Sequence, residues 1–173
     1  MTGPLPAHLA CRALVLGVGN RLFGDDGFGP RLTQRLLDSG GLPEDACLID
    51  AGTGAARLLF DLLLSPRRPA LLLILDAVDL PEHLPGEVFE LAPDELPSNK
   101  RDDFSLHQFP GSDLLRELEL SGCRVRIIAC QVKRVPAEIA EGLSPEVEAA
   151  LGGAARLVRA RLRAWAAPPE GRT

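Results

Sequence analysis

The sequence predicts an α/β fold in which a mostly parallel sheet is covered by helices on both faces. Short apolar runs alternate along the chain with segments whose apolar residues recur at the helical period. The run at 13–18 is continuously apolar, which is typical of a strand buried on both faces. Strands that alternate with helices indicate parallel strands joined by crossover helices.

The first half of the chain contains three strand-like runs and two helical segments. ALVLGV at 13–18 is bounded by glycine, and apolar residues at 28, 32, 36 and 37 give the next segment a helical period. The pattern then repeats, because CLID at 47–50 predicts a strand and ARLLFDLLL at 56–64 predicts a helix. ALLLILDAV at 70–78 is the third strand.

The second half begins with a proline-rich loop and a short predicted strand, GEVFEL at 86–91. A polar stretch without periodicity follows, then a helix at 112–120 and a strand at 123–132. Ser144 is placed to cap the last helix, and Pro145 suits its first position. Its apolar residues keep a 3.6-residue period that predicts packing on the sheet, at positions 147, 150, 151, 154, 157, 158, 162 and 165.

Composition indicates one domain spanning residues 1–173, with a folded core at about 13–166 and disordered ends. The net charge of −5 and the pI near 5.2 leave no basic surface for nucleic acid or anionic membrane. We find no signal peptide or membrane-spanning run, so we expect a cytoplasmic protein. The four cysteines lack metal-binding spacing and are predicted to be reduced and buried.

The loop GVGNRLFGDDG at 17–27 begins like a nucleotide-binding glycine loop but ends in two carboxylates. A dinucleotide motif would need glycine where Leu22 stands, and a phosphate loop would need a cation and a hydroxyl at Asp25 and Asp26. The acidic pair suits a cation instead. We expect Gly17 and Gly19 to turn the chain and expose the pair, although one aspartate could simply cap the next helix.

Three carboxylates are predicted to lie along one edge of the sheet. Asp26 follows the first strand, Asp50 ends the second and Asp76 lies near the end of the third. Ligands bind at this edge of open α/β sheets, and the strand order 2-1-3 would place Asp26 nearer to Asp76 than to Asp50. Each aspartate alone could equally serve a local turn. Two carboxylates and one imidazole can hold a divalent transition metal, and His107 is the candidate third ligand unless it is only a surface residue.

The motifs together resemble the hydrogenase maturation proteases, which trim the large subunit of nickel–iron hydrogenases. The resemblance rests on GVGNRLFGDDGFGP, LIDAGTG, LLILDAVDLPEHLPGEVFEL and the histidine of FSLHQ, in that order. It implies a three-layer fold with a twisted five-stranded sheet. It also implies an endopeptidase that removes the C-terminal extension of the precursor after nickel insertion.

The resemblance further implies roles for individual residues. Asp26, Asp76 and His107 match the metal-contacting residues, with Asp26 and Asp76 also catalytic, and Ni²⁺ would arrive with the precursor. Gly52, Thr53 and Gly54 match a turn that shapes the substrate cleft, although Ala51 replaces a glycine found in many relatives. Two alternatives stay open: a nickel-sensing chaperone that binds the precursor without cutting it, and a nucleotide-binding domain.

Overall fold

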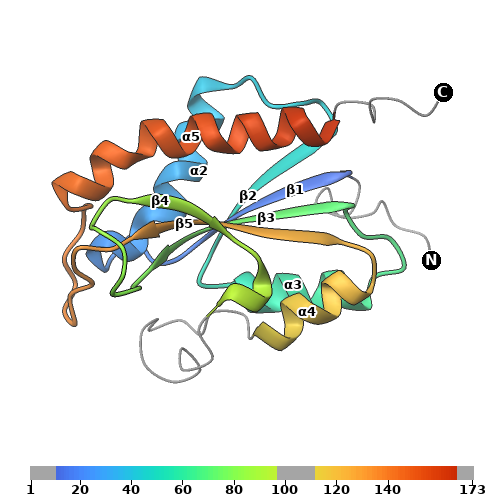
Figure 1. Ribbon diagram of the computed structural model, residues 1–173, viewed down its shortest axis with the longest axis horizontal. Coiled ribbons are helices and arrows are strands. Elements are labelled where there is room, and N and C mark those ends of the chain that lie inside the picture. Colours follow the sequence, from blue (N-terminus) through green and yellow to red (C-terminus); the bar gives the residue numbers. More distant parts are fainter. Residues whose placement is uncertain (1–10, 97–111, 167–173) are drawn as a thin grey trace.

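The computed structural model describes residues 11–96 and 112–166, which form a five-stranded sheet between helices (Figure 1). The strands are β1 (Ala13–Val18), β2 (Ala46–Gly52), β3 (Leu71–Val78), β4 (Val88–Leu91) and β5 (Arg124–Gln131). The helices are α2 (Phe28–Ser39), α3 (Ala55–Leu64), α4 (Ser112–Leu120) and α5 (Pro145–Ala166), with 3-10 turns η1 (Gly24–Gly27) and η2 (Pro93–Glu95). The predicted α/β class and three-layer arrangement are confirmed.

The strand order in the sheet is β2-β1-β3-β5-β4. The pairs β1–β2, β1–β3 and β3–β5 are parallel, and β4 pairs antiparallel to β5 at the edge. Parallel neighbours need crossover connections, which α2, α3 and α4 supply on the two faces of the sheet. The predicted order 2-1-3 for the first three strands is therefore confirmed.

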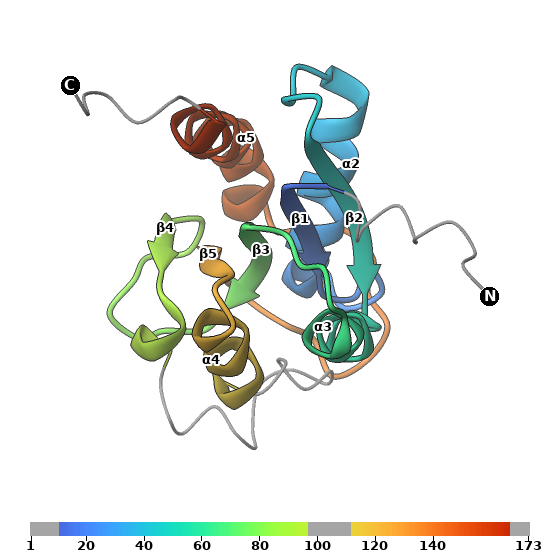
Figure 2. The ribbon, with the colours of Figure 1, turned by 90° about the vertical axis from the view of Figure 1, so that its right-hand side faces the viewer.

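Each face of the sheet has its own hydrophobic core. Figure 2 shows α2 and α5 on one face and α3 and α4 on the other. Alternate residues of β3 divide between the two: Leu71, Leu73 and Leu75 pack with α2 and α5, whereas Leu72 and Ile74 pack with α3 and α4. This two-sided burial explains why β1 and β3 are continuous apolar runs.

The cysteines are free thiols; Cys11, Cys123 and Cys130 are buried, and Cys47 is half-buried. Burial raises the pKa of Cys11 and Cys130 to about 12 and that of Cys123 to about 11. Thiols with such pKa values stay protonated at neutral pH and are poor nucleophiles. They are therefore packing residues, as expected, although Cys47 is less buried than predicted.

The predicted elements recur with boundaries shifted by a few residues, and β4 is shorter than its predicted run. Pairing of Gly86 and Glu87 with Gln131 continues the ladder before the strand itself begins at Val88. Within residues 11–96 and 112–166, no helix combines the length and apolar character that a bilayer crossing requires. The predicted disordered ends lie outside the described residues.

Candidate active site

The site predicted from the sequence lies where the chain reverses its winding direction. Helix α2 leaves β1 on one face of the sheet, and α3 leaves β2 on the other, so the carboxyl ends of β1 and β3 form the switch point. In Figure 1, the loops that follow β1, β3 and β5 gather at the left end of the sheet. Residues from distant parts of the sequence therefore meet there.

Glycines allow the loop after β1 to pack closely at this edge. Gly19 has a φ of +126°, and a Cβ at this position would lie 1.9 Å from the carbonyl oxygen of Asp26. A Cβ on Gly29 would lie 2.2 Å from the carbonyl oxygen of Val18 and 2.3 Å from that of Leu75. The first turn of α2 thus rests directly on the backbones of β1 and β3, which only glycine permits.

Asp26 lies in η1, which packs against β3. The residue is 6% exposed, and its Oδ2 accepts the backbone N–H of Asn20 at 2.7 Å. The same N–H also points to the carbonyl oxygen of Asp26 at 3.1 Å. The loop therefore closes on Asp26 and fixes its carboxylate relative to the sheet edge.

Asp76 lies in β3, immediately after the residue that pairs with Gly17 of β1. It is 5% exposed, and its Oδ1 accepts the N–H of Ala77 at 2.8 Å. By strand alternation it shares a face with Ile74 and Val78, which pack toward α3 and α4. Asp26 in η1 and Asp76 in β3 thus bring two buried carboxylates to this part of the sheet, and carboxylates are ligands of divalent cations.

His107, the third predicted ligand, lies outside the described residues. Within residues 11–96 and 112–166, no three His, Cys, Asp or Glu side chains are close enough together to hold a metal. The donor chemistry of Asp26, Asp76 and an imidazole nonetheless fits a divalent transition metal with open coordination positions. The ligand set remains a prediction.

Asp50 has a different environment from the two buried aspartates. It is exposed, and its Oδ2 accepts a hydrogen bond of 2.8 Å from Arg21, which also donates to the carbonyl oxygen of Pro30 at 2.9 Å. Its Oδ1 accepts the N–H of Gly52 at 3.1 Å. Asp50 thus already has a cationic partner and holds the start of the turn after β2.

The predicted substrate-binding residues form that turn. Gly52 has a φ of +50°, a left-handed conformation that suits glycine, and it is half-buried. Thr53 and Gly54 are exposed at the same edge of the sheet as Asp26 and Asp76. They are accessible to a peptide, and their role in binding one remains a prediction.

The acidic pair is not exposed, contrary to the sequence-based expectation. Asp25 is 1% exposed, and it does not cap α2, because Gly27 precedes that helix without a side-chain cap. Its Oδ2 accepts the N–H groups of Lys133 and Arg134, and its Oδ1 accepts that of Ser144 at 2.6 Å. Ser144 also donates its hydroxyl to Asp25. The carboxylate is buried because the chain after β5 supplies four donors.

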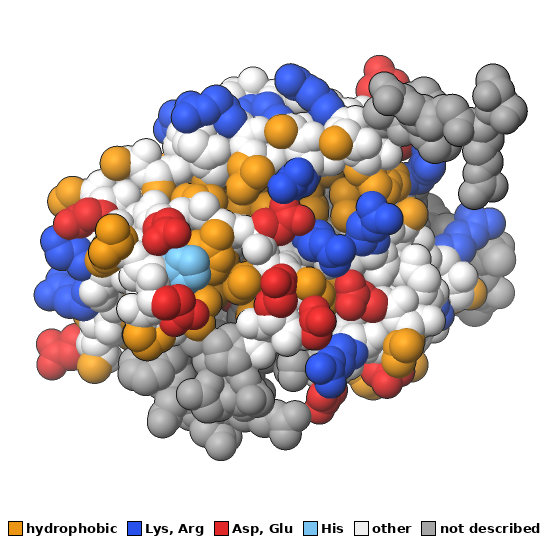
Figure 3. All heavy atoms as spheres, in the orientation of Figure 1, with side chains coloured by type: hydrophobic (Ala, Val, Ile, Leu, Met, Phe, Trp, Pro, Cys, Tyr) orange, Lys and Arg blue, Asp and Glu red, His pale blue; other side chains and the backbone are white. Residues whose placement is uncertain are grey.

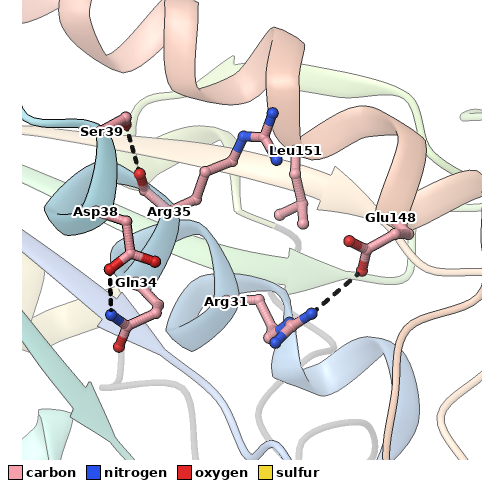
Figure 4. A pocket seen from close by; sticks show the side chains of 7 residues that line it. All are labelled: Arg31, Gln34, Arg35, Asp38, Ser39, Glu148 and Leu151. Carbon is pink, nitrogen blue, oxygen red and sulfur yellow. Dashed lines mark hydrogen bonds and ion pairs between the residues drawn. The ribbon is translucent and has the colours of Figure 1, made fainter.

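An open depression of about 400 Å³ lies elsewhere, between α2 and α5 (Figure 4). Its lining is mostly charged or polar, and Arg31 faces Glu148 across it at 3.9 Å. It contains none of the predicted site residues. Basic and acidic side chains are also interspersed on the face shown in Figure 3, so that face has no continuous basic surface among the described residues.

Residues 30–160 match the sequence model of the hydrogenase maturation proteases. This chain belongs to that family. A putative hydrogenase maturation protease from Methanocaldococcus jannaschii is 34% identical over 87% of this chain and 96% of its own length. The hydrogenase 2 maturation protease of Escherichia coli is 32% identical over 88% of this chain and 91% of its own.

The solved structures give the same result. The hydrogenase maturating endopeptidase HybD from Escherichia coli superimposes with a TM-score of 0.73 at 31% identity, covering 90% of this chain and 94% of that one. The predicted family, fold and peptidase class of this hydrogenase maturation protease are therefore confirmed.

Two contacts at the site were not predicted from the sequence. The loop residue Arg21 pairs with Asp50, 29 positions away, and Asp25 binds residues more than 100 positions away. Arg21 lies in the same GVGNRLFGDDG loop as Asp26, so its position in the sequence could have identified it as a residue of the site. No local pattern identifies the partners of Asp25.

Proposed function

We propose that this protein cleaves the C-terminal extension from a nickel–iron hydrogenase large-subunit precursor after nickel has been inserted. The observation that carries the proposal is a pair of buried carboxylates in a chain of this family: Asp26 lies in η1, which packs against β3, and Asp76 lies in β3 itself. The three cysteines with raised pKa values are buried, so thiolate catalysis is disfavoured.

In this mechanism the nickel belongs to the substrate, because it arrives with the precursor. Asp26, Asp76 and His107 would complete its coordination and thereby place the scissile bond at the sheet edge. Cleavage would then depend on nickel insertion. A metal in this position polarises a carbonyl or acidifies a bound water, and a carboxylate can act as general base.

The test is cleavage of nickel-loaded precursor by three variants, Asp26→Asn, Asp76→Asn and His107→Ala. We expect each to reduce the rate by at least about 100-fold while circular dichroism stays unchanged. Mass spectrometry of the precursor's C-terminus measures the product. Asp45→Asn is the matched control, because Asp45 pairs with Arg12 at the opposite edge, and we expect normal cleavage.

Unimpaired cleavage by all three variants would refute the proposed site. If the unchanged protein binds the loaded precursor but never shortens it, the chain is instead a chaperone. Cleavage of nickel-free precursor at the full rate would contradict the dependence on nickel.

A further inference from the structure

The turn that carries Asp26 is fastened to a segment from the other end of the sequence. Asp25 receives hydrogen bonds of 2.9 Å from the N–H of Lys133, 3.0 Å from that of Arg134, and 2.6 and 3.0 Å from the N–H and hydroxyl of Ser144. All three partners lie in the connection between β5 and α5. One side chain thus holds both ends of that connection.

Backbone contacts extend this attachment. The N–H of Gly24 donates to the carbonyl oxygen of Ala140 at 2.8 Å, and the N–H of Ala140 donates to that of Leu22 at 2.9 Å. A Cβ on Gly24 would lie 2.9 Å from the ring of Pro136. Residues 133–144 therefore pack alongside η1 at the carboxyl edge of the sheet.

The charge of Asp25 is required for this arrangement. Both of its oxygens face donors, so an asparagine amide would direct N–H groups at the N–H of Ser144 or at those of Lys133 and Arg134. The carboxylate also lies beside the first residues of α5, where the helix dipole favours negative charge. A neutral isostere cannot satisfy the same donors.

We propose that Asp25 is a positioning residue: it locks η1 to residues 133–144 so that the adjacent Asp26 is held in the geometry that contacts the metal-bearing substrate. This inference rests on the proposed role of Asp26. Asp25 itself touches neither metal nor substrate. Residues 133–144 thereby become part of the framework of the site.

The test compares Asp25→Asn with Val158→Ala, a core substitution in α5 that lowers stability without contacting the turn. For Asp25→Asn we expect Cd²⁺ affinity, measured by calorimetry, and kcat for the nickel-loaded precursor each to fall by about tenfold, as for residues that orient metal ligands. The amides of Lys133, Arg134 and Ser144 should exchange hydrogen faster. Val158→Ala should keep Cd²⁺ affinity and kcat.

Normal Cd²⁺ affinity and kcat in Asp25→Asn, with both lost in Asp26→Asn, would overturn the positioning role alone. Equal losses in Val158→Ala would overturn it too, because the effect would follow from stability. Full activity of Asp26→Asn would instead contradict the proposed function. If Asp25→Asn does not fold, Ser144→Ala, which removes one donor of four, should show a smaller loss in the same direction, and no loss would overturn the inference.

Discussion

At the scale of single residues, the site depends on positions where a side chain cannot be accommodated. Gly29 lets the first turn of α2 contact the carbonyl oxygens of Val18 and Leu75. Backbone atoms of two central strands cannot move aside as a flexible side chain can. The glycine therefore sets the distance between the helix that follows Asp26 and the strand that carries Asp76.

We expect Gly29→Ala to lower the free energy of unfolding by about 3 kcal/mol or more, because the new methyl group forces α2 away from the sheet. Urea denaturation measures the change. The control is Gly153→Ala on the exposed side of α5, where the new Cβ meets only the end of Arg156. That variant should gain up to about 1 kcal/mol from helix propensity. Equal stability of the two variants would refute the steric explanation.

Individual residues also show what the sequence can and cannot predict. Asp26 and Asp76 are identifiable from the sequence because each follows or ends an apolar run, which is a local signal. The burial of Asp25 is not, because its donors come from a loop 108 to 119 positions away. The glycines of the loop after β1 are a local pattern that the sequence shows. The residues that bind Asp25 in this loop lie at 133–144, so no local pattern shows them.

At the scale of elements, the edge strand β4 is stabilised by ion pairs as well as by its backbone hydrogen bonds to β5. Glu90 of β4 accepts a hydrogen bond from Arg161 of α5, and it pairs with Arg126 of β5 at 3.6 Å. Its side chain is largely buried, whereas Arg161 is half-exposed. The carboxylate thus joins an edge strand, its neighbour and the covering helix.

We expect Glu90→Gln to lower the free energy of unfolding by about 1 kcal/mol, because Arg161 loses its carboxylate and Arg126 keeps only Glu119, while both arginines remain partly hydrated. The matched control is Glu148→Gln, whose partner Arg31 lies at 3.9 Å on the surface, and we expect a change below about 0.5 kcal/mol. Urea denaturation at low and high salt separates the two. A larger loss for Glu148→Gln would contradict this description of β4.

The elements themselves were largely predictable because apolar periodicity reports burial directly. β1 and β3 are buried on both faces, so their sequences are apolar almost throughout. The antiparallel direction of β4 was not predicted, because the sequence of a short strand such as GEVFEL does not show in which direction it pairs with its neighbour. It is compatible with the short connection after β3, which leaves no length for a crossover helix.

At the scale of the whole molecule, the buried thiols should make the free energy of unfolding depend on pH in the alkaline range. The pKa values of Cys11, Cys123 and Cys130 rise from 9.0 to between about 11 and 12 in the folded state. Above pH 9 the unfolded chain loses these protons first. Their contribution to stability is therefore complete below pH 9 and is lost as the pH rises toward 12.

We expect the free energy of unfolding to fall between pH 9 and 11 by at most about 1.4 kcal/mol per pH unit for each thiol. The chain has no tyrosine, so few other groups titrate there. Urea denaturation under reducing conditions at pH 7, 9 and 10.5 measures the slope. The variant with all three cysteines changed to alanine should show a flatter profile, and an unchanged slope would exclude the thiols as its cause.

The attachment of Asp25 also has a consequence for how the protein is made. Its partners are translated more than 100 residues after it, so the ribosome releases the Asp26 turn long before the segment that locks it. A nascent chain could pair β1, β2 and β3 early and still lack a finished site. The site would then reach its full activity only after synthesis has reached α5, because Ser144 is the last of these partners to be made.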